Sequence, residues 1–278
     1  AALLVNALYE HGGSSKFDFP EIIGTDENAV LYAYAGGENA HQLLTSNRLT
    51  SDEKEKLLRK IIDAVADMHS IYREVLPGTK TKPWYLGDET LEDFYIKKDK
   101  AKTEFTIKTF REIGLELESK EFQKAEEYAT HFGERVFSAD AKLIHFRVNL
   151  NPEIELSEII KLDENMKRRV NGPYGDWVYM NYLSSLPEDL RNLAEKIMIE
   201  KRMKACGTSY EQEFDALNIV AGLECLRNAA TLSQQGLKRE YLKEIEHIKS
   251  HFDRLSENFS DLREKFQSWH KAYIAQLN

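Results

Sequence analysis

Residues 142–166, KLIHFRVNLNPEIELSEIIKLDENM, interrupt a chain whose other residues mostly follow a helical pattern. The stretch contains two short β-like runs, Leu143–Phe146 and Glu158–Leu162, which are separated by residues 147–157, including Pro152. Two such runs joined by turn-forming residues are typical of a β hairpin. The sequence therefore predicts a short pair of strands near residues 143–162 within a predominantly helical chain, and this combination defines an α+β fold.

A second hairpin is predicted closer to the N-terminus, near residues 18–35. Two apolar runs flank the polar tip at residues 25–28 in the segment FPEIIGTDENAVLYAYAGG, which covers residues 19–37. Residues 1–11 have apolar side chains at helical spacing and are expected to form a short helix. The N-terminal part of the chain is therefore expected to contain one helix and one small sheet.

A long helix is expected to begin near Thr50. Thr50 and Glu53 have the spacing of a capping box, and apolar residues at helical intervals follow them. Two charged helices are expected next, at about 89–114 and 119–137.

The chain beyond Pro187 is predicted to be helical to its end, with breaks at Gly207 and Gly236, because glycine readily adopts the left-handed conformation that ends many helices. Apolar residues at 241–273 alternate in steps of four and three, which is the period of a coiled coil. The pattern favours one apolar face packed on the helical block, as two helices broken near Asn258. The alternative is a seam for self-association through residues 241–273.

Composition restricts the class of protein and its partners. The chain has 278 residues, and 38 basic against 47 acidic side chains give a net charge of −9, which argues against a nucleic-acid partner. No stretch approaches the roughly 18 apolar residues of a membrane span, and the first residues lack the basic start of a signal peptide. Two cysteines, Cys206 and Cys225, cannot form a multi-disulfide framework. We therefore expect a cytoplasmic protein with no membrane partner.

The order of these elements resembles the aminoglycoside phosphotransferase and choline kinase superfamily, whose members have a protein kinase-like fold. The resemblance covers most of the chain and is carried by VLYAYAGGENAHQLL (30–44), a hairpin ending in a hinge with glycine, by IIDAVADMHS (61–70), a helix ending near His69, and by LECLRNAATLSQQGLKREYLKEI (223–245). It implies a truncated small β lobe at residues 1–49 and a predominantly helical large lobe at residues 50–278.

The family's catalytic segment, His-Gly-Asp-Leu-His-Pro-x-Asn, can be matched in two registers. Placing residues 149–152 on Asp-Leu-His-Pro puts Asn149 at the catalytic Asp and Ile154 at the metal-binding Asn. Placing His145 on the leading His puts Arg147 at the catalytic Asp instead. The first register is favoured because the leucine and the proline both match. Neither register supplies the carboxylate that would act as the base.

The resemblance also implies residues for nucleotide and metal. Asp163 follows an apolar run and is the candidate magnesium ligand together with Asn151, while Asp176 would brace the catalytic loop. The alternatives are a turn-capping role for Asp163 and a helix N-cap role for Asp176. Three hinge positions would contact an adenine ring through the backbone: Tyr34, Ala35 and Gly36.

ATP and Mg²⁺ are the cofactors that the family resemblance alone implies, and the alternative is that the chain binds no cofactor. The Gly-rich lid and strand Lys that kinases place on the phosphates have no counterpart in the sequence. We predict a catalytically impaired, pseudokinase-like module that binds a small molecule or a protein partner. The alternative is an active ATP-dependent phosphotransferase for a small hydroxylated or amino-sugar-like substrate, with the lid supplied by sequence not shown. A purely helical interaction protein is a third hypothesis, and the strand signals count against it.

Overall fold

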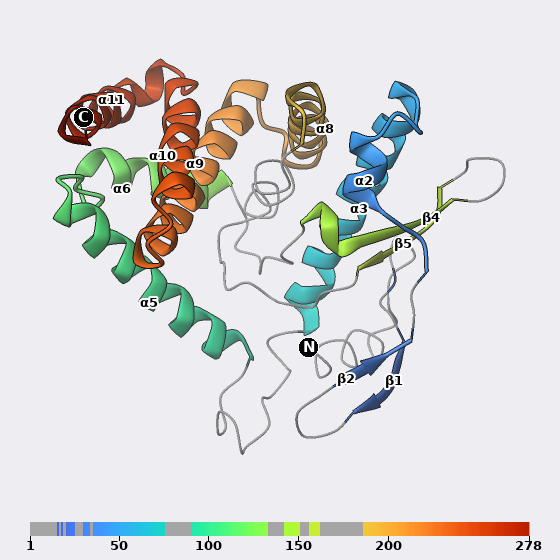
Figure 1. Cartoon of the computed structure of the whole chain (residues 1–278). Coiled ribbons are helices and arrows are strands. Elements are labelled where there is room, and N and C mark those ends of the chain that lie inside the picture. The colour runs from blue at the N-terminus through green and yellow to red at the C-terminus, as the bar shows by residue number, and fades with distance from the viewer. Residues whose placement is uncertain are drawn as a thin grey trace. The chain divides into compact units, whose positions relative to one another are not determined.

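The computed structural model describes residues 16, 18, 21–25, 30–33, 36–75, 91–132, 142–150, 156–161 and 186–277. These residues form a mostly helical α+β structure with two small antiparallel sheets (Figure 1). They group into two compact units. The first contains the described residues within Ala1–Tyr95, Val136–Arg168 and Tyr179–Met198, and the second contains those within Ile96–Arg135 and Ile199–Asn278.

The hairpin predicted near residues 18–35 is confirmed. Strand β1 (Ile22–Thr25) pairs antiparallel with β2 (Val30–Tyr32), and Thr25 lies opposite Val30 at the turn end. The register shifts between Ile22 and Gly24, so one extra residue bulges from β1. The helix expected at residues 1–11 lies outside the described residues.

The strand pair predicted near residues 143–162 is also confirmed. Strand β4 (Phe146–Leu150) pairs antiparallel with β5 (Leu156–Lys161), and β3 (Glu38–Asn39) pairs with the other edge of β4. The start of the first strand differs from the prediction, because Leu143–His145 form a single 3-10 turn. Burial explains the difference, since the alternation of buried and half-buried side chains that marks a strand begins only at Phe146.

Two helices of the first unit begin next to side chains that cap them, and the sequence predicted one of these caps, at Thr50. Asn39 caps α2 (Ala40–Thr45) by accepting a hydrogen bond from the Gln42 amide. The capping box ahead of α3 (Ser51–Val75) is present, because Thr50 and Glu53 each accept a hydrogen bond from the other's backbone N–H. Helix α2 packs against β3 and β4, and α3 packs against β5. The apolar face of α3 is buried at Leu57, Leu58, Ile61, Ile62, Val65 and Met68.

The two charged helices are confirmed as α5 (Leu91–Glu112) and α6 (Lys120–Phe132). The break predicted at Gly207 lies between α8 (Glu188–Cys206) and α9 (Tyr210–Gln234), and the break at Gly236 precedes α10 (Lys238–Asp253). Both glycines have the left-handed backbone expected of them, with φ of 68° and 72°.

The second unit is built around α9, which is buried along most of its length. Helix α10 packs along it (Figure 1), and the two approach so closely that a Cβ atom at Gly222 would lie 2.5 Å from the Phe252 ring. A 3-10 turn (Glu257–Phe259) separates α10 from α11 (Ser260–Leu277), so the predicted break near Asn258 is confirmed. The apolar positions between 241 and 269 are buried within this chain, while Tyr273 is half-buried. Self-association through this segment stays a prediction.

Candidate functional site

The face of β4 that bears Arg147 and Asn149 is the best described part of the predicted site. Phe146 and Val148 are fully buried, whereas Arg147 and Asn149 between and after them are half-buried. Because successive side chains of a strand point to opposite faces, Arg147 and Asn149 share the face that is turned away from the core. Both registers of the family motif therefore lead to the same face of the same strand.

The two glycines of the predicted hinge, Gly36 and Gly37, lie close to Asn149. In the β3–β4 ladder Glu38 lies opposite Val148, so Gly37 comes next to Asn149. A Cβ atom built on Gly37 would lie 2.7 Å from Asn149 Oδ1 and 3.0 Å from the Val148 carbonyl oxygen. A Cβ atom on Gly36 would lie 3.9 Å from the same Oδ1 atom. Gly36 and Asn149, both predicted site residues, thus meet although they are far apart in the sequence.

Asn39 and Glu38 hold this segment in place. The Asn39 side chain accepts a hydrogen bond from Gln42 N at 3.1 Å and donates one to the Ile144 carbonyl oxygen at 2.9 Å. Glu38 forms an ion pair with Arg48. Sequence reasoning missed Asn39, although an asparagine directly before a helix is a recognised N-cap signal.

The remaining predicted site residues lie outside the described residues. These are Tyr34 and Ala35 of the hinge, Asn151 and Asp163 as metal ligands, and Asp176 as the brace. Within the part of the chain that the structure describes, no group of three or more His, Cys, Asp or Glu residues could hold a metal ion. No described helix is both long enough and apolar enough to cross a membrane.

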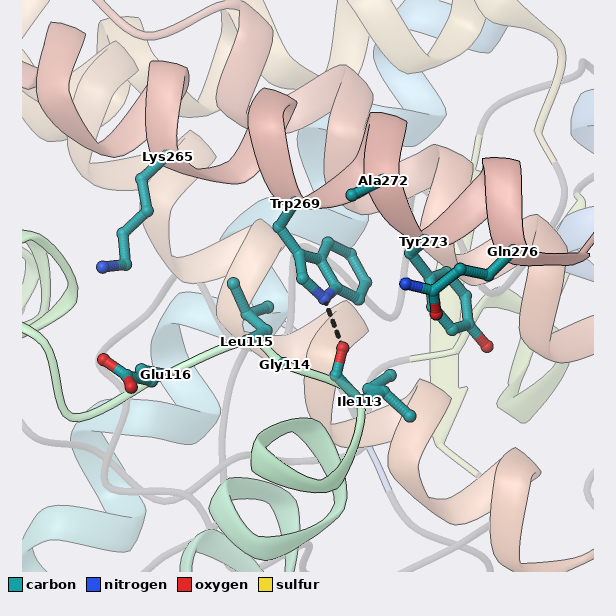
Figure 2. A pocket seen from close by; sticks show the side chains of 9 residues that line it. All are labelled: Ile113, Gly114, Leu115, Glu116, Lys265, Trp269, Ala272, Tyr273 and Gln276. Atoms are coloured by element: carbon teal, nitrogen blue, oxygen red, sulfur yellow. Dashed lines mark hydrogen bonds between the residues drawn. The ribbon is translucent and has the colours of Figure 1, made fainter.

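The second unit contains a pocket of about 350 Å³ between α11 and the turn that follows α5 (Figure 2). This volume is at the low end for small-molecule sites. Trp269 and Tyr273 stack at one end with ring centroids 5.2 Å apart, while Lys265 and Glu116 lie at the other end. Leu115 contributes a buried apolar side chain between them.

Most polar groups of this pocket already have partners within the protein. Trp269 Nε1 donates a hydrogen bond to the Ile113 carbonyl oxygen at 2.9 Å, and Lys265 Nζ lies 3.4 Å from a carboxylate oxygen of Glu121. The Tyr273 ring packs edge to face against Tyr241 with centroids 6.4 Å apart, and burial together with the neighbouring Tyr273 raises the pKa of Tyr241 well above its usual value. These pairings stabilise the fold, and they leave few groups that could recognise a ligand.

Glu213, near the start of α9, is an ionisable side chain with 0% exposure. One carboxylate oxygen accepts a hydrogen bond from the Thr208 hydroxyl, and the other lies 3.8 Å from Arg202 Nε with no hydrogen-bond partner among the described residues. Burial raises the pKa of Glu213 to about 7, because the charged form loses its hydration. Nearby Tyr128 has its pKa raised to about 12, first by burial and then by the charges of Asp215, Glu213 and Glu211.

No protein family model matches the chain, and no curated protein matches it significantly.

Proposed function

We propose that the chain is a kinase-fold domain resembling small-molecule phosphotransferases, which binds a nucleoside through the hinge segment ending at Gly36 and is catalytically impaired. The observation that supports this proposal most strongly is the meeting of Gly36 with Asn149. In the family that the chain resembles, the position matching Gly36 belongs to the nucleotide hinge and the position matching Asn149 belongs to the catalytic segment. The order of elements agrees with the same proposal: a hairpin, the long helix α3, a second hairpin and a helical block.

The chemistry of Asn149 is the reason to propose impaired catalysis. An asparagine amide can orient a hydroxyl group by hydrogen bonding but cannot take its proton. A positioned general base contributes roughly 10²–10⁴ in rate, so its replacement by an amide leaves slow turnover at best. Arg147, the alternative in the other register, is permanently charged and is no better as a base. Asp163 and Asn151 are the residues proposed to bind Mg²⁺, and Asp176 is proposed as the brace.

The proposal is tested by ligand binding and by turnover in parallel. A nucleoside held mainly by backbone groups of the hinge is expected to bind at about the millimolar level, which corresponds to about 4 kcal/mol. At about 1 mM ligand this gives only about 0.4 kcal/mol of stabilisation, so a small upward shift in the melting temperature is expected with adenosine and with ATP·Mg²⁺. Tripolyphosphate with Mg²⁺ is the matched control and should give no shift, because it lacks the adenine ring.

Turnover is measured as phosphate release from ATP with amino-sugar and choline acceptors. We expect no release above background. Acceptor-dependent phosphate release that is abolished by Asp163→Ala would show that the chain is an active phosphotransferase and not an impaired module. The absence of any adenosine effect would remove the nucleotide site from the proposal. A cytoplasmic location and a small-molecule or protein partner remain part of the same proposal.

A further inference from the structure

We infer that Gly37 is a positioning residue, whose missing side chain makes the room in which the Asn149 amide sits beside the hinge. The inference rests on the proposed function in one respect, namely that this segment is where a ligand binds. The contact itself is independent of any ligand. Asn149 Oδ1 lies 2.7 Å from the point that a Cβ atom of residue 37 would occupy, which is closer than real Cβ atoms approach an oxygen.

Gly36 and Gly37 differ in the space available for a Cβ atom. Both have a left-handed backbone, with φ of 65° at Gly36 and 68° at Gly37, so any other residue would be strained at either position. At Gly36 the nearest atom to an added Cβ is at 3.9 Å, which is ordinary contact. At Gly37 an added Cβ would meet both Asn149 and the Val148 carbonyl oxygen. Backbone freedom alone therefore accounts for Gly36, whereas Gly37 also provides space.

The backbone at Gly37 is held on its C-terminal side. Glu38 and Asn39 are paired with β4, and the Asn39 side chain is bonded both to the start of α2 and to the Ile144 carbonyl oxygen. Relieving the 2.7 Å contact with Asn149 by moving this strand would disturb these bonds, whereas the 3.0 Å contact with the Val148 oxygen needs only a backbone shift of a few tenths of an ångström. We therefore expect a methyl group at position 37 to make the Asn149 side chain rotate away from the hinge. Gly37 thereby determines where the Asn149 amide is presented.

The test compares Gly37→Ala with Gly36→Ala, a matched control in which alanine must also adopt a left-handed backbone. The readout is the side-chain amide resonance of Asn149 in proton–nitrogen correlation spectra, assigned by its loss in Asn149→Asp. We expect Gly37→Ala to shift this resonance strongly and to lower the melting temperature by several degrees more than Gly36→Ala. An unchanged Asn149 resonance in Gly37→Ala, or equal effects of the two substitutions, would overturn the inference.

A double variant covers the case in which Gly37→Ala alone does not fold. Asn149→Ala removes the atom at 2.7 Å and leaves the Val148 oxygen at 3.0 Å, a contact that a small backbone adjustment can relieve. Gly37→Ala combined with Asn149→Ala should therefore recover most of the extra loss in melting temperature, with Asn149→Ala alone completing the cycle. If the double variant does not regain this melting temperature, the steric conflict at position 37 is not with Asn149.

Titration of adenosine into the wild-type protein separates this inference from the proposed function. Adenosine is expected to shift the Gly36 and Gly37 amide resonances and the Asn149 side-chain resonance together. If the alanine variants behave as expected but adenosine shifts nothing, the positioning role stands and the nucleotide site is refuted. If adenosine binds while the two alanine variants behave alike, the positioning role is refuted and the nucleotide site stands.

Discussion

Replacing Glu213 by glutamine should stabilise the protein increasingly as the pH rises from 5 to 8. The carboxyl group is fully buried, and its pKa is raised from the usual 4.5 to about 7. Below pH 4.5 the group is protonated in both the folded and the unfolded chain. Between 4.5 and 7 the unfolded chain loses the proton while the folded chain keeps it, so the free energy of unfolding falls with pH. Above pH 7 both states are deprotonated, so the free energy of unfolding falls no further.

The size of the effect follows from the two pKa values and from Arg202. The difference between 4.5 and about 7 corresponds to about 3 kcal/mol at most. The guanidinium of Arg202 favours the charged carboxylate, but its Nε atom is 3.8 Å from the carboxylate oxygen, too far for a hydrogen bond. Burial therefore outweighs the ion pair. With that partial compensation we expect a gain of about 1 to 3 kcal/mol for Glu213→Gln at pH 8 and almost none near pH 4.5.

The assay is equilibrium urea unfolding of the wild type and Glu213→Gln at several pH values between 5 and 8. Glutamine keeps the oxygen that accepts the Thr208 hydroxyl, so changes unrelated to charge give an offset that is constant with pH. Glu211→Gln is the matched control, because Glu211 is on the same turn of α9 but exposed, and it should show no pH-dependent difference. A difference that stays flat, or a variant that becomes less stable than the wild type at high pH, would refute the reasoning. The second result would mean that the Glu213–Arg202 ion pair stabilises the fold.

Three further substitutions test the packing of the helices by urea unfolding. Gly222→Ala should lower the free energy of unfolding by about 1–3 kcal/mol because the methyl group would lie 2.5 Å from the Phe252 ring. Adding Phe252→Leu to this variant should recover part of the lost free energy. Asp215→Ala should lower the free energy of unfolding by about 1–3 kcal/mol because it leaves the N–H and hydroxyl of half-buried Ser256 without their acceptor, the buried Asp215 carboxylate, whereas Asp215→Asn should lower it less. Thr50→Ala should cost about 1 kcal/mol through loss of the cap on α3, and an unchanged stability would show that this helix end frays freely.

The elements that the sequence predicts well are those with a local physical signal. Thr50 and Glu53 cap α3 through contacts between residues three apart, and Gly207 and Gly236 end helices through their own backbone freedom. Strand β3 has no such signal, because it is two residues long and pairs only because β4 passes beside it. Leu143–His145 give a misleading local signal, because their apolar residues suggest a strand although the backbone forms a 3-10 turn.

Whether the predicted residues form a site stays a prediction, and the geometry around Asn149 could not be predicted at all because it depends on strand register. Asn149 and Val148 are neighbours in the chain, yet one is half-buried beside Gly37 and the other is in the core. A shift of one residue in the pairing of β4 would exchange them, because the side chains of a strand alternate between its two faces. What fixes the register is that Phe146 and Val148 must both be buried while Gly37 leaves room on the opposite face for an amide. That requirement joins two segments distant in the sequence, the glycine at position 37 and strand β4, so no local pattern reveals it. Gly37 lies within the quoted hinge segment 30–44, but only the structure places it beside position 149.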